Sequence, residues 1–269
     1  MATIWAVVKD PGGTGNLLPI LPLLREKGHE VRLFLHEGGK GESVLGAVGE
    51  NFSVLADPIK AQFFRLTKLP NLLVTSMCSG GGIGRMLVSA LRSDGVPTAA
   101  LQDFWGARIK TDWADPLWHP DLICVNDEFG EDLVLENWGA ETRIAVTGYP
   151  SLDALSRINR EDGTKVGREK LGITDDLPIV FYPGQVWHAG RTLYEVTRTL
   201  NYLNARCHLV ASKHGRMGEA PEEERFWDLA QEEFRGTFHL FTDFRYVREV
   251  VLSSKVVVGM YSSLQIPAC

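Results

Sequence analysis

Three glycines stand between the first apolar run of the sequence and the amphipathic stretch that follows it. They lie in residues 10–16, DPGGTGN, at positions 12, 13 and 15. Glycine permits positive φ angles and close backbone approach, Asn16 can cap a following helix, and the N–H groups at a helix start favour anions. The segment therefore predicts either a loop that faces a phosphate or a tight strand-to-helix turn. It has neither the full G-x-G-x-x-G spacing of a dinucleotide fingerprint nor the G-K-[ST] of a P-loop.

Two titratable side chains follow other apolar runs and are candidates for acid–base chemistry. Asp103, in LQDFWG, stands where a strand should end, so its carboxylate could act as a base or bind a hydroxyl. His188, in FYPGQVWHAGRTL, has an imidazole that could donate to a pyrophosphate or accept a proton near neutral pH. Two other interpretations stay open: a turn carboxylate beside packed aromatic rings, and a solvated histidine packed on Trp187.

The remaining candidates are suited to phosphate oxygens. They belong to the turn that contains His188, to the basic segment SKHGR and to the hydroxyl pair of MYSSLQ, each directly after an apolar run. An exposed basic turn and a plain pair of N-cap serines are equally open interpretations. The candidates are Gly184, Gln185, Lys213, His214, Ser262 and Ser263.

Short apolar runs alternate with helical or loop stretches along the whole chain, which predicts an α/β fold with parallel sheets. A polar segment that contains several glycines, residues 149–178, separates two such series and should form a hinge. We expect strands at residues 3–8, 30–35, 71–75, 97–101, 121–125 and 143–147, then at 179–182, 208–211, 238–241 and 256–260. We expect helices at residues 17–27, 83–92, 128–138, 192–204, 222–234 and 246–253.

Composition excludes several classes of function. The 269 residues are 44% hydrophobic and carry a net charge of −6 with scattered basic residues, so a nucleic-acid partner is not expected. The four cysteines lie far apart without a C-x-x-C pair, which disfavours a zinc site or a disulfide framework. No apolar run reaches membrane-spanning length and the first residues carry no basic signal region, so we expect a cytoplasmic protein without a membrane span, metal or cofactor.

Three segments resemble the two-lobed GT-B glycosyltransferases, whose relatives include the nucleotide-sugar 2-epimerases. GGTGNLLPILPLLREKGHEVRLF is similar to their N-terminal segment, RIAVTGYPSLDAL to the end of their first lobe, and VVVGMYSS to a donor-binding turn of their second. The resemblance spans nearly the entire chain. It implies two Rossmann-like lobes, residues 1–155 on the acceptor side and 156–269 on the nucleotide-donor side, with the second lobe incomplete.

The resemblance implies binding of a nucleotide-diphosphate sugar and transfer of its sugar to an unknown acceptor. Lys213, His214 and the serine pair would offset charge on the departing diphosphate, and Asp103 or His188 would deprotonate the acceptor. The segment that borders the acceptor and the transferred group would be Gly12, Gly13, Thr14, Gly15 and Asn16.

Two departures from the family pattern bear on activity. Family members often have a histidine directly after the first loop, where this chain has Asn16, which cannot accept a proton. After the serine turn this chain has Pro267 and Ala268 in place of an acidic residue followed by alanine. A 2-epimerase and a non-catalytic sugar-nucleotide-binding remnant remain alternatives, and the early end of the second lobe leads us to expect self-association.

Overall fold

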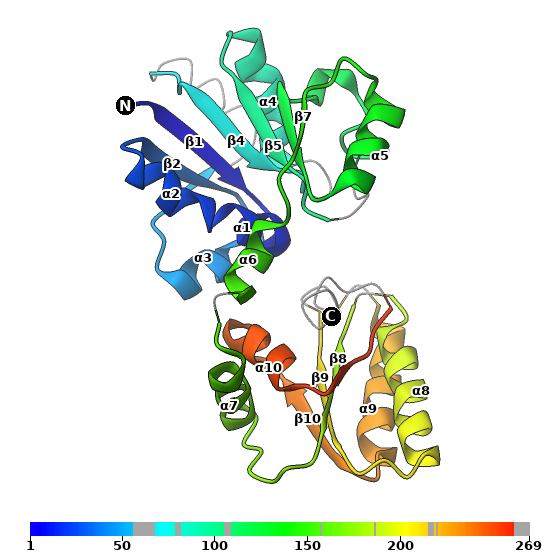
Figure 1. Cartoon of the computed structure of the whole chain (residues 1–269). Coiled ribbons are helices and arrows are strands. Elements are labelled where there is room, and N and C mark those ends of the chain that lie inside the picture. Colours follow the sequence, from blue (N-terminus) through cyan, green and yellow to red (C-terminus); the bar gives the residue numbers. More distant parts are fainter. Residues whose placement is uncertain are drawn as a thin grey trace. The chain divides into compact units, whose positions relative to one another are not determined.

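The computed structural model describes residues 1–55, 68–78, 82–104, 109–156, 158–185, 187–214, 218 and 220–260. The chain divides into two compact units, Met1–Ala154 and Leu155–Cys269. Each unit is an α/β layer structure around one sheet whose strand pairs are all parallel (Figure 1).

The sheet of the first unit has seven strands in the order β3-β2-β1-β4-β5-β6-β7. The strand order reverses between β1 and β4, so their carboxyl ends mark the switch point at which open α/β sheets bind ligands. The strands are β1 (Thr3–Val8), β2 (Glu30–His36), β3 (Ser53–Leu55), β4 (Leu72–Ser76), β5 (Thr98–Leu101), β6 (Leu122–Val125) and β7 (Ile144–Val146). The helices are α1 (Pro11–Leu17), α2 (Ile20–Glu26), α3 (Glu42–Val48), α4 (Gly82–Ser93), η2 (Pro116–Trp118), α5 (Glu128–Trp138) and α6 (Pro150–Ser156).

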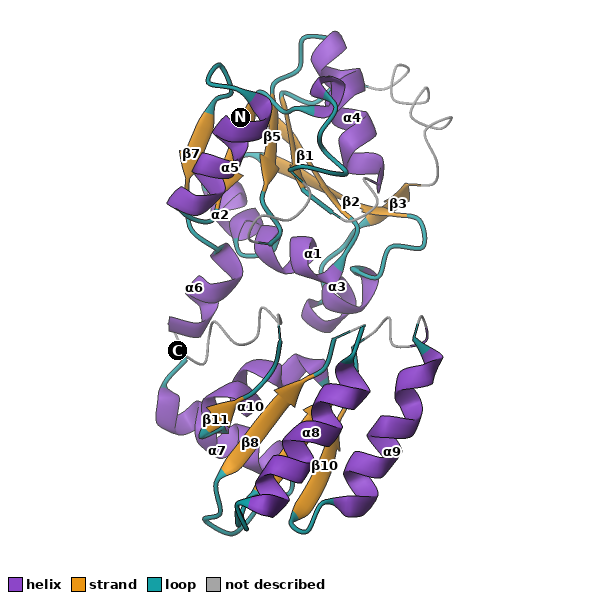
Figure 2. Ribbon diagram, turned by 90° about the vertical axis from the view of Figure 1, so that its right-hand side faces the viewer, coloured by secondary structure: helices purple, strands orange, loops and turns teal. Residues whose placement is uncertain are grey.

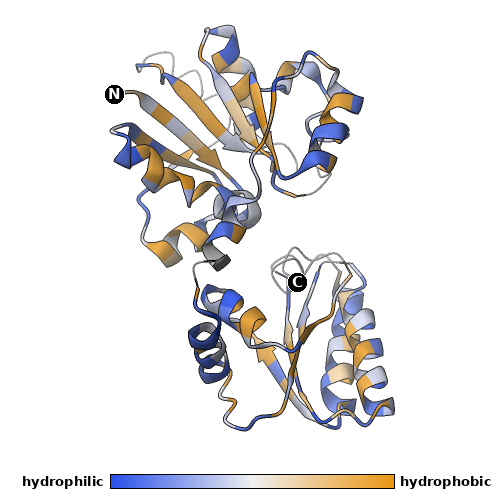
Figure 3. Ribbon diagram, viewed as in Figure 1, coloured by the Kyte–Doolittle hydropathy of each residue, from blue (hydrophilic) through white to orange (hydrophobic). Residues whose placement is uncertain are grey.

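Alternate residues of β1 supply the two apolar layers of the first unit. Ile4 and Val8 pack in one buried cluster with Leu21 of α2, whereas Trp5 lies in the other with Leu87 of α4. A strand buried on both faces is typical of parallel sheets, and Figure 3 shows the apolar colour along the central strands. These layers fix the strand ends, and therefore the loops that follow them.

The sheet of the second unit has the order β10-β9-β8-β11, so its switch point lies between β8 and β11. Helices α8 and α9 cover one face and α7 and α10 cover the other (Figure 2). The strands are β8 (Ile179–Pro183), β9 (His208–Ser212), β10 (Thr237–Phe241) and β11 (Val256–Val257). The helices are α7 (Arg160–Lys170), α8 (Ala189–Tyr202), η4 (Pro221–Glu223), α9 (Glu224–Glu233), η5 (Phe244–Tyr246) and α10 (Val247–Ser253).

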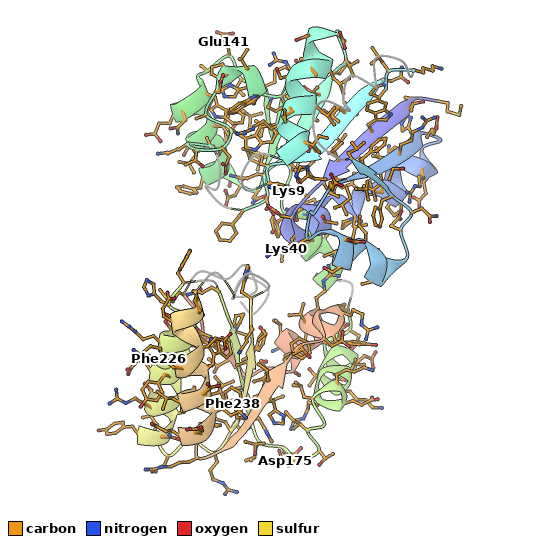
Figure 4. The ribbon with its side chains drawn as sticks, turned by 180° about the vertical axis from the view of Figure 1, so that it is seen from behind. Lys9, Lys40, Glu141, Asp175, Phe226 and Phe238 are labelled. Carbon is orange, nitrogen blue, oxygen red and sulfur yellow. The ribbon has the colours of Figure 1, made fainter. Side chains whose placement is uncertain are left out.

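A chain of hydrogen bonds joins three polar side chains around His208, the first residue of β9, and reaches His239 in the middle of β10. The buried His208 bonds through Nδ1 to Nε2 of His239 at 3.0 Å and through Nε2 to Oδ1 of Asp175 at 2.9 Å. Asp175, labelled in Figure 4, is exposed, and the His208 bond is the main reason that its pKa lies below the ordinary value.

The expected loop at residues 10–16 was wrong, because α1 begins at Pro11 and contains all three glycines. None of them takes a positive φ. The single helix expected at residues 17–27 is divided, with α1 ending at Leu17 and α2 beginning at Ile20. Pro19 is the N-cap residue of α2.

Candidate functional site

Helix α1 begins directly at the carboxyl end of β1, at the switch point of the first unit. Its N-cap residue, Asp10, is extended, with φ −91° and ψ 155°. Pro11 follows at the first helical position, where its fixed φ suits a helix and its missing N–H costs nothing. Thr14 strengthens this turn by donating its hydroxyl to the Asp10 carbonyl at 2.8 Å. The glycine segment is thus held as a short helix across the strand ends.

Two of the three glycines allow α1 to lie against the ends of β4 and β5. A Cβ at Gly12 would overlap Oδ1 of Asp103, and one at Gly13 would overlap the side chain of Ser76. A Cβ at Gly15 would meet no described atom within 4 Å beyond its own helix and chain neighbours. The need for glycine here is therefore close approach, at positions 12 and 13, rather than a turn.

Asn16 does not cap a helix, contrary to the expectation from its position. It is completely buried in α1, where Nδ2 donates to the Gln102 carbonyl and Oδ1 accepts from the Ser151 N–H, both at 3.3 Å. Both ends of its amide therefore join α1 to the end of β5 and to the first turn of α6. Asn16 therefore has a structural role at this position, and that role does not require a side chain that can accept a proton.

Asp103 is half-buried after β5 and supplies negative charge to the cluster around α1. Burial first, and the Asp103 charge second, raise the pKa of the Cys78 thiol to about 12. The same two causes, in the same order, raise the pKa of Tyr149 to about 12. Both groups are therefore protonated at neutral pH, which leaves the Asp103 carboxylate as the member of the three suited to accept a proton.

Several residues of this cluster were missed by sequence reasoning. Ser76 ends β4 and lies 3.0 Å from the Cys78 sulfur, and Tyr149 is hydrogen-bonded to Asn16 and Ser151. Lys9, at the end of β1, lies with Lys40 at the same end of the first unit's sheet, as Figure 4 shows. The signal that could have found Ser76 and Lys9 was their place at the ends of predicted strands.

In the second unit, a turn leads from β8 into α8. Gly184 donates its N–H to the Ser212 carbonyl at 2.8 Å, and a Cβ there would overlap that carbonyl oxygen and crowd the Trp227 ring. Gln185 is 5% exposed. His188 is exposed, has a left-handed φ of 60°, and is the N-cap residue of α8 without a side-chain capping bond. The turn thus buries Gln185 and presents His188 to solvent.

The first turn of α8 is fixed by three contacts. Tyr182 Oη donates to the Ala189 carbonyl at 2.8 Å, and Glu223 Oε2 accepts from the Arg191 N–H at 2.9 Å. Gly190 lies so close to the Glu223 carbonyl that a Cβ would overlap it. These contacts explain why α8 begins at Ala189, three residues before the start expected from the sequence.

Lys213 and His214 follow β9 at the same edge of this sheet. The Lys213 ammonium forms an ion pair with Glu224 and lies 5.5 Å from the centre of the Trp227 ring. The same ring lies close to Gly184 and Gly190. Lys213, the β8–α8 turn and the start of α8 are therefore all neighbours of the Trp227 side chain. Trp227, Glu223 and Glu224 were not foreseen as parts of this site.

Some candidates lie outside the described residues, namely Ser262 and Ser263. Among the side chains that the structure does describe, no group of three or more His, Cys, Asp or Glu is arranged to hold a metal ion. The described helices likewise include none that is both long and apolar enough to cross a membrane.

The sequence matches no protein-family model and no curated protein. Solved structures do match across almost the whole chain. A UDP-GlcNAc 2-epimerase from Methanocaldococcus jannaschii, solved with UDP-GlcNAc and UDP, is 13% identical with a TM-score of 0.71, over 99% of this chain and 81% of that one. HepE from Anabaena, solved with UDP and glucose, is 14% identical with a TM-score of 0.67, over 96% and 73%.

MurG from Acinetobacter baumannii is also similar, at 13% identity and a TM-score of 0.57, over 96% of this chain and 73% of that one. At such identities the similarity concerns the fold alone. The expected fold class is confirmed: the chain has the α/β architecture with Rossmann-like parallel sheets that is found in GT-B glycosyltransferases and UDP-GlcNAc 2-epimerases.

Proposed function

We propose that the protein binds a nucleotide-diphosphate sugar and transfers the sugar to an acceptor. The observation that carries this proposal is the position of the polar clusters: in both units they lie at the carboxyl ends of parallel strands, at the switch point of the sheet. Proteins of the same fold have been solved with UDP or a UDP-sugar bound, which supports a ligand of that class.

The second unit is the proposed donor side. The diphosphate would lie against the Gly184–Gln185 turn and against Ser262 and Ser263, whose hydroxyls could donate to its oxygens. Lys213 and His214, which follow β9, would offset its negative charge. Gly12 and Gly13 are not proposed to hold it, because they are used for the packing of α1 against Asp103 and Ser76.

Asp103 is the proposed base of the first unit. Its carboxylate would take the proton of an acceptor hydroxyl as that oxygen bonds to the anomeric carbon of the donor. The bond between that carbon and the diphosphate oxygen breaks in the same step, and the nucleoside diphosphate leaves with the bonding electrons. His188 is the second candidate base, since its exposed imidazole is not used in capping α8.

Two alternatives are favoured by specific observations. A 2-epimerase is supported by the fold similarity to the M. jannaschii enzyme. A non-catalytic binding module is supported by Asn16, whose amide is used entirely in joining α1 to its neighbours. The three functions differ in what happens to a bound sugar nucleotide: transfer with release of the nucleoside diphosphate, isomerisation, or no change.

One experiment separates them. The protein is mixed with a panel of nucleoside diphosphate sugars, and its melting temperature, the released nucleoside diphosphate and the sugar stereochemistry are measured. Transfer should release diphosphate and be reduced strongly by Asp103→Asn. A new epimer without release would favour the 2-epimerase, and a thermal shift without turnover the binding module. No shift and no turnover with any donor would contradict the proposal.

The donor side has its own test. Replacement of both Ser262 and Ser263 by Ala should weaken nucleotide binding by about 1–3 kcal/mol, the scale of lost hydrogen bonds to a charged group. Ser93→Ala, in the first unit, removes an exposed hydroxyl that donates to the Ser89 carbonyl within α4 and serves as the control. Isothermal titration that gives wild-type affinity for the double variant would reject this part of the proposal.

A further inference from the structure

Three consecutive glutamates form an acidic turn beside the site of the second unit. The acidic turn comprises residues 221–224, PEEE, which make up η4 and the first residue of α9. One of its carboxylates contacts Lys213, which the proposed function assigns to the diphosphate, and another contacts the start of α8, which follows the β8–α8 turn. Glu223 contacts the start of α8, and Glu224 contacts Lys213. Glu222 is exposed and makes no such contact with a described residue.

Glu224 neutralises the cation of this site. Its Oε2 pairs with the Lys213 ammonium, and the side chains of Lys213 and Glu224 are 35% and 46% exposed. Lys213 lies above the Trp227 ring, whose other contacts include Gly184 of the β8–α8 turn. The Lys213 ammonium is therefore held by a carboxylate when no ligand is bound.

Glu223 acts on the same site through a second contact. Glu223 is 4% exposed, and its carboxylate accepts the Arg191 N–H and so occupies one of the donors at the start of α8 with a negative charge. The Arg191 guanidinium itself lies 5.2 Å from the centre of the ring of Phe226 on α9, the residue labelled in Figure 4. A second anion near this helix start would meet repulsion from Glu223.

We propose that the carboxylates of the acidic turn compete with the diphosphate of the donor for the Lys213 ammonium and for the start of α8 in the second unit. Glu224 occupies one of the three N–H donors of the Lys213 ammonium and offsets its charge, so it weakens the pairing of that ammonium with a diphosphate oxygen, and Glu223 lowers the affinity by repulsion. The contact is autoinhibitory, and it sets how much nucleotide is needed to occupy the site. The inference rests on the proposed function, since it takes the second unit to be the donor side.

The test compares three variants that each remove one negative charge from the acidic turn. Glu224→Gln frees Lys213, Glu223→Gln keeps an acceptor oxygen for the Arg191 N–H, and Glu222→Gln is the matched control. Inorganic diphosphate and UDP are titrated into each full-length variant by calorimetry. Glu224→Gln should bind both ligands about two- to fivefold more tightly, the range expected for a half-exposed ion pair. Glu223→Gln should also bind more tightly, and Glu222→Gln should match the wild type.

Lys213→Met supplies the second measurement. Added to Glu224→Gln, it should abolish the gain in affinity, because the released ammonium is then absent. Equal affinities of Glu224→Gln and Glu222→Gln, or a gain that persists without Lys213, would overturn the competition. If the wild type binds UDP and Glu224→Gln does not improve on it, the donor assignment stands and the inference fails. Binding by neither protein would reject both.

Discussion

We expect Gly13→Ala to destabilise the first unit, whereas Gly15→Ala, two residues further along α1, should not. A Cβ at Gly13 would overlap Oγ and Cβ of Ser76 and lie 3.3 Å from the Cys78 sulfur. Gly13 and Ser76 are both buried, so neither can move aside without disturbing the packing of α1 on β4. At Gly15 the new methyl group would meet no described neighbour within 4 Å beyond its own helix and chain neighbours.

The structure allows the size of each effect to be worked out. Overpacking of a buried site costs about 1–3 kcal/mol, and the better helix propensity of alanine returns at most about 1 kcal/mol. The free energy of unfolding should therefore fall by about 1–2 kcal/mol in Gly13→Ala. For a unit of this size, that lowers the midpoint of thermal unfolding by about 2–8 °C. Gly15→Ala keeps only the propensity gain and should raise the midpoint slightly.

The assay is thermal unfolding followed by circular dichroism, with both variants measured beside the wild type. Ser76→Gly combined with Gly13→Ala removes both overlapping atoms and should recover part of the loss. Equal midpoints for Gly13→Ala and Gly15→Ala would show that glycine at position 13 is not required for the approach of α1 to β4.

Three further predictions concern other contacts. Gly12→Ala should push the Asp103 carboxylate aside at little cost in stability, so sugar transfer measured by released nucleoside diphosphate should fall about 10–100-fold while the melting temperature stays near that of the wild type. The stability that the Asp175 carboxylate gains from His208 is complete above about pH 4 and is lost as the pH falls through the lowered pKa of Asp175. Asp175→Asn should therefore make unfolding by acid less steep, and acid-unfolding curves identical to those of the wild type would contradict this. Tyr182→Phe removes a buried hydrogen bond to the first turn of α8 and should cost about 1 kcal/mol in denaturant unfolding, with wild-type stability as the contrary result.

The strands were the part of the fold that the sequence predicted best. The apolar runs of central strands such as β1, β8 and β9 are buried on both faces. The expected bounds of the predicted strands agree within one residue except at β11, which ends at Val257 rather than Met260. The short β3 was missed because two of its three residues are exposed, so it carries no apolar run. Helix starts were harder, because tertiary contacts decide them: Tyr182 and Glu223 fix the start of α8 from outside the helix.

The candidate site was predicted only where its residues follow predicted strands. Asp103, Gly184 and Lys213 all lie at strand ends, as their positions indicated. The partners that determine their surroundings come from distant segments and carry no local pattern. From the sequence alone, Trp227 is indistinguishable from any other apolar position of a helix, and Glu224 from an exposed charged residue at a helix start. The roles of Gly12 and Gly13 could not be seen either, because they depend on side chains more than sixty residues away.

The chain of hydrogen bonds from Asp175 through His208 to His239 has a consequence for how the second unit responds to acid. It runs from the loop before β8 through the first residue of β9 to the middle of β10, whereas Lys213 and the β8–α8 turn lie at the carboxyl ends of their strands. Burial first, and the nearby His208 second, lower the pKa of His239, so the folded unit resists its protonation as the pH falls below about 6.5. Mild acid would thus lower the thermal stability of the second unit through a histidine within the sheet, whether or not a ligand is bound at the carboxyl ends of the strands.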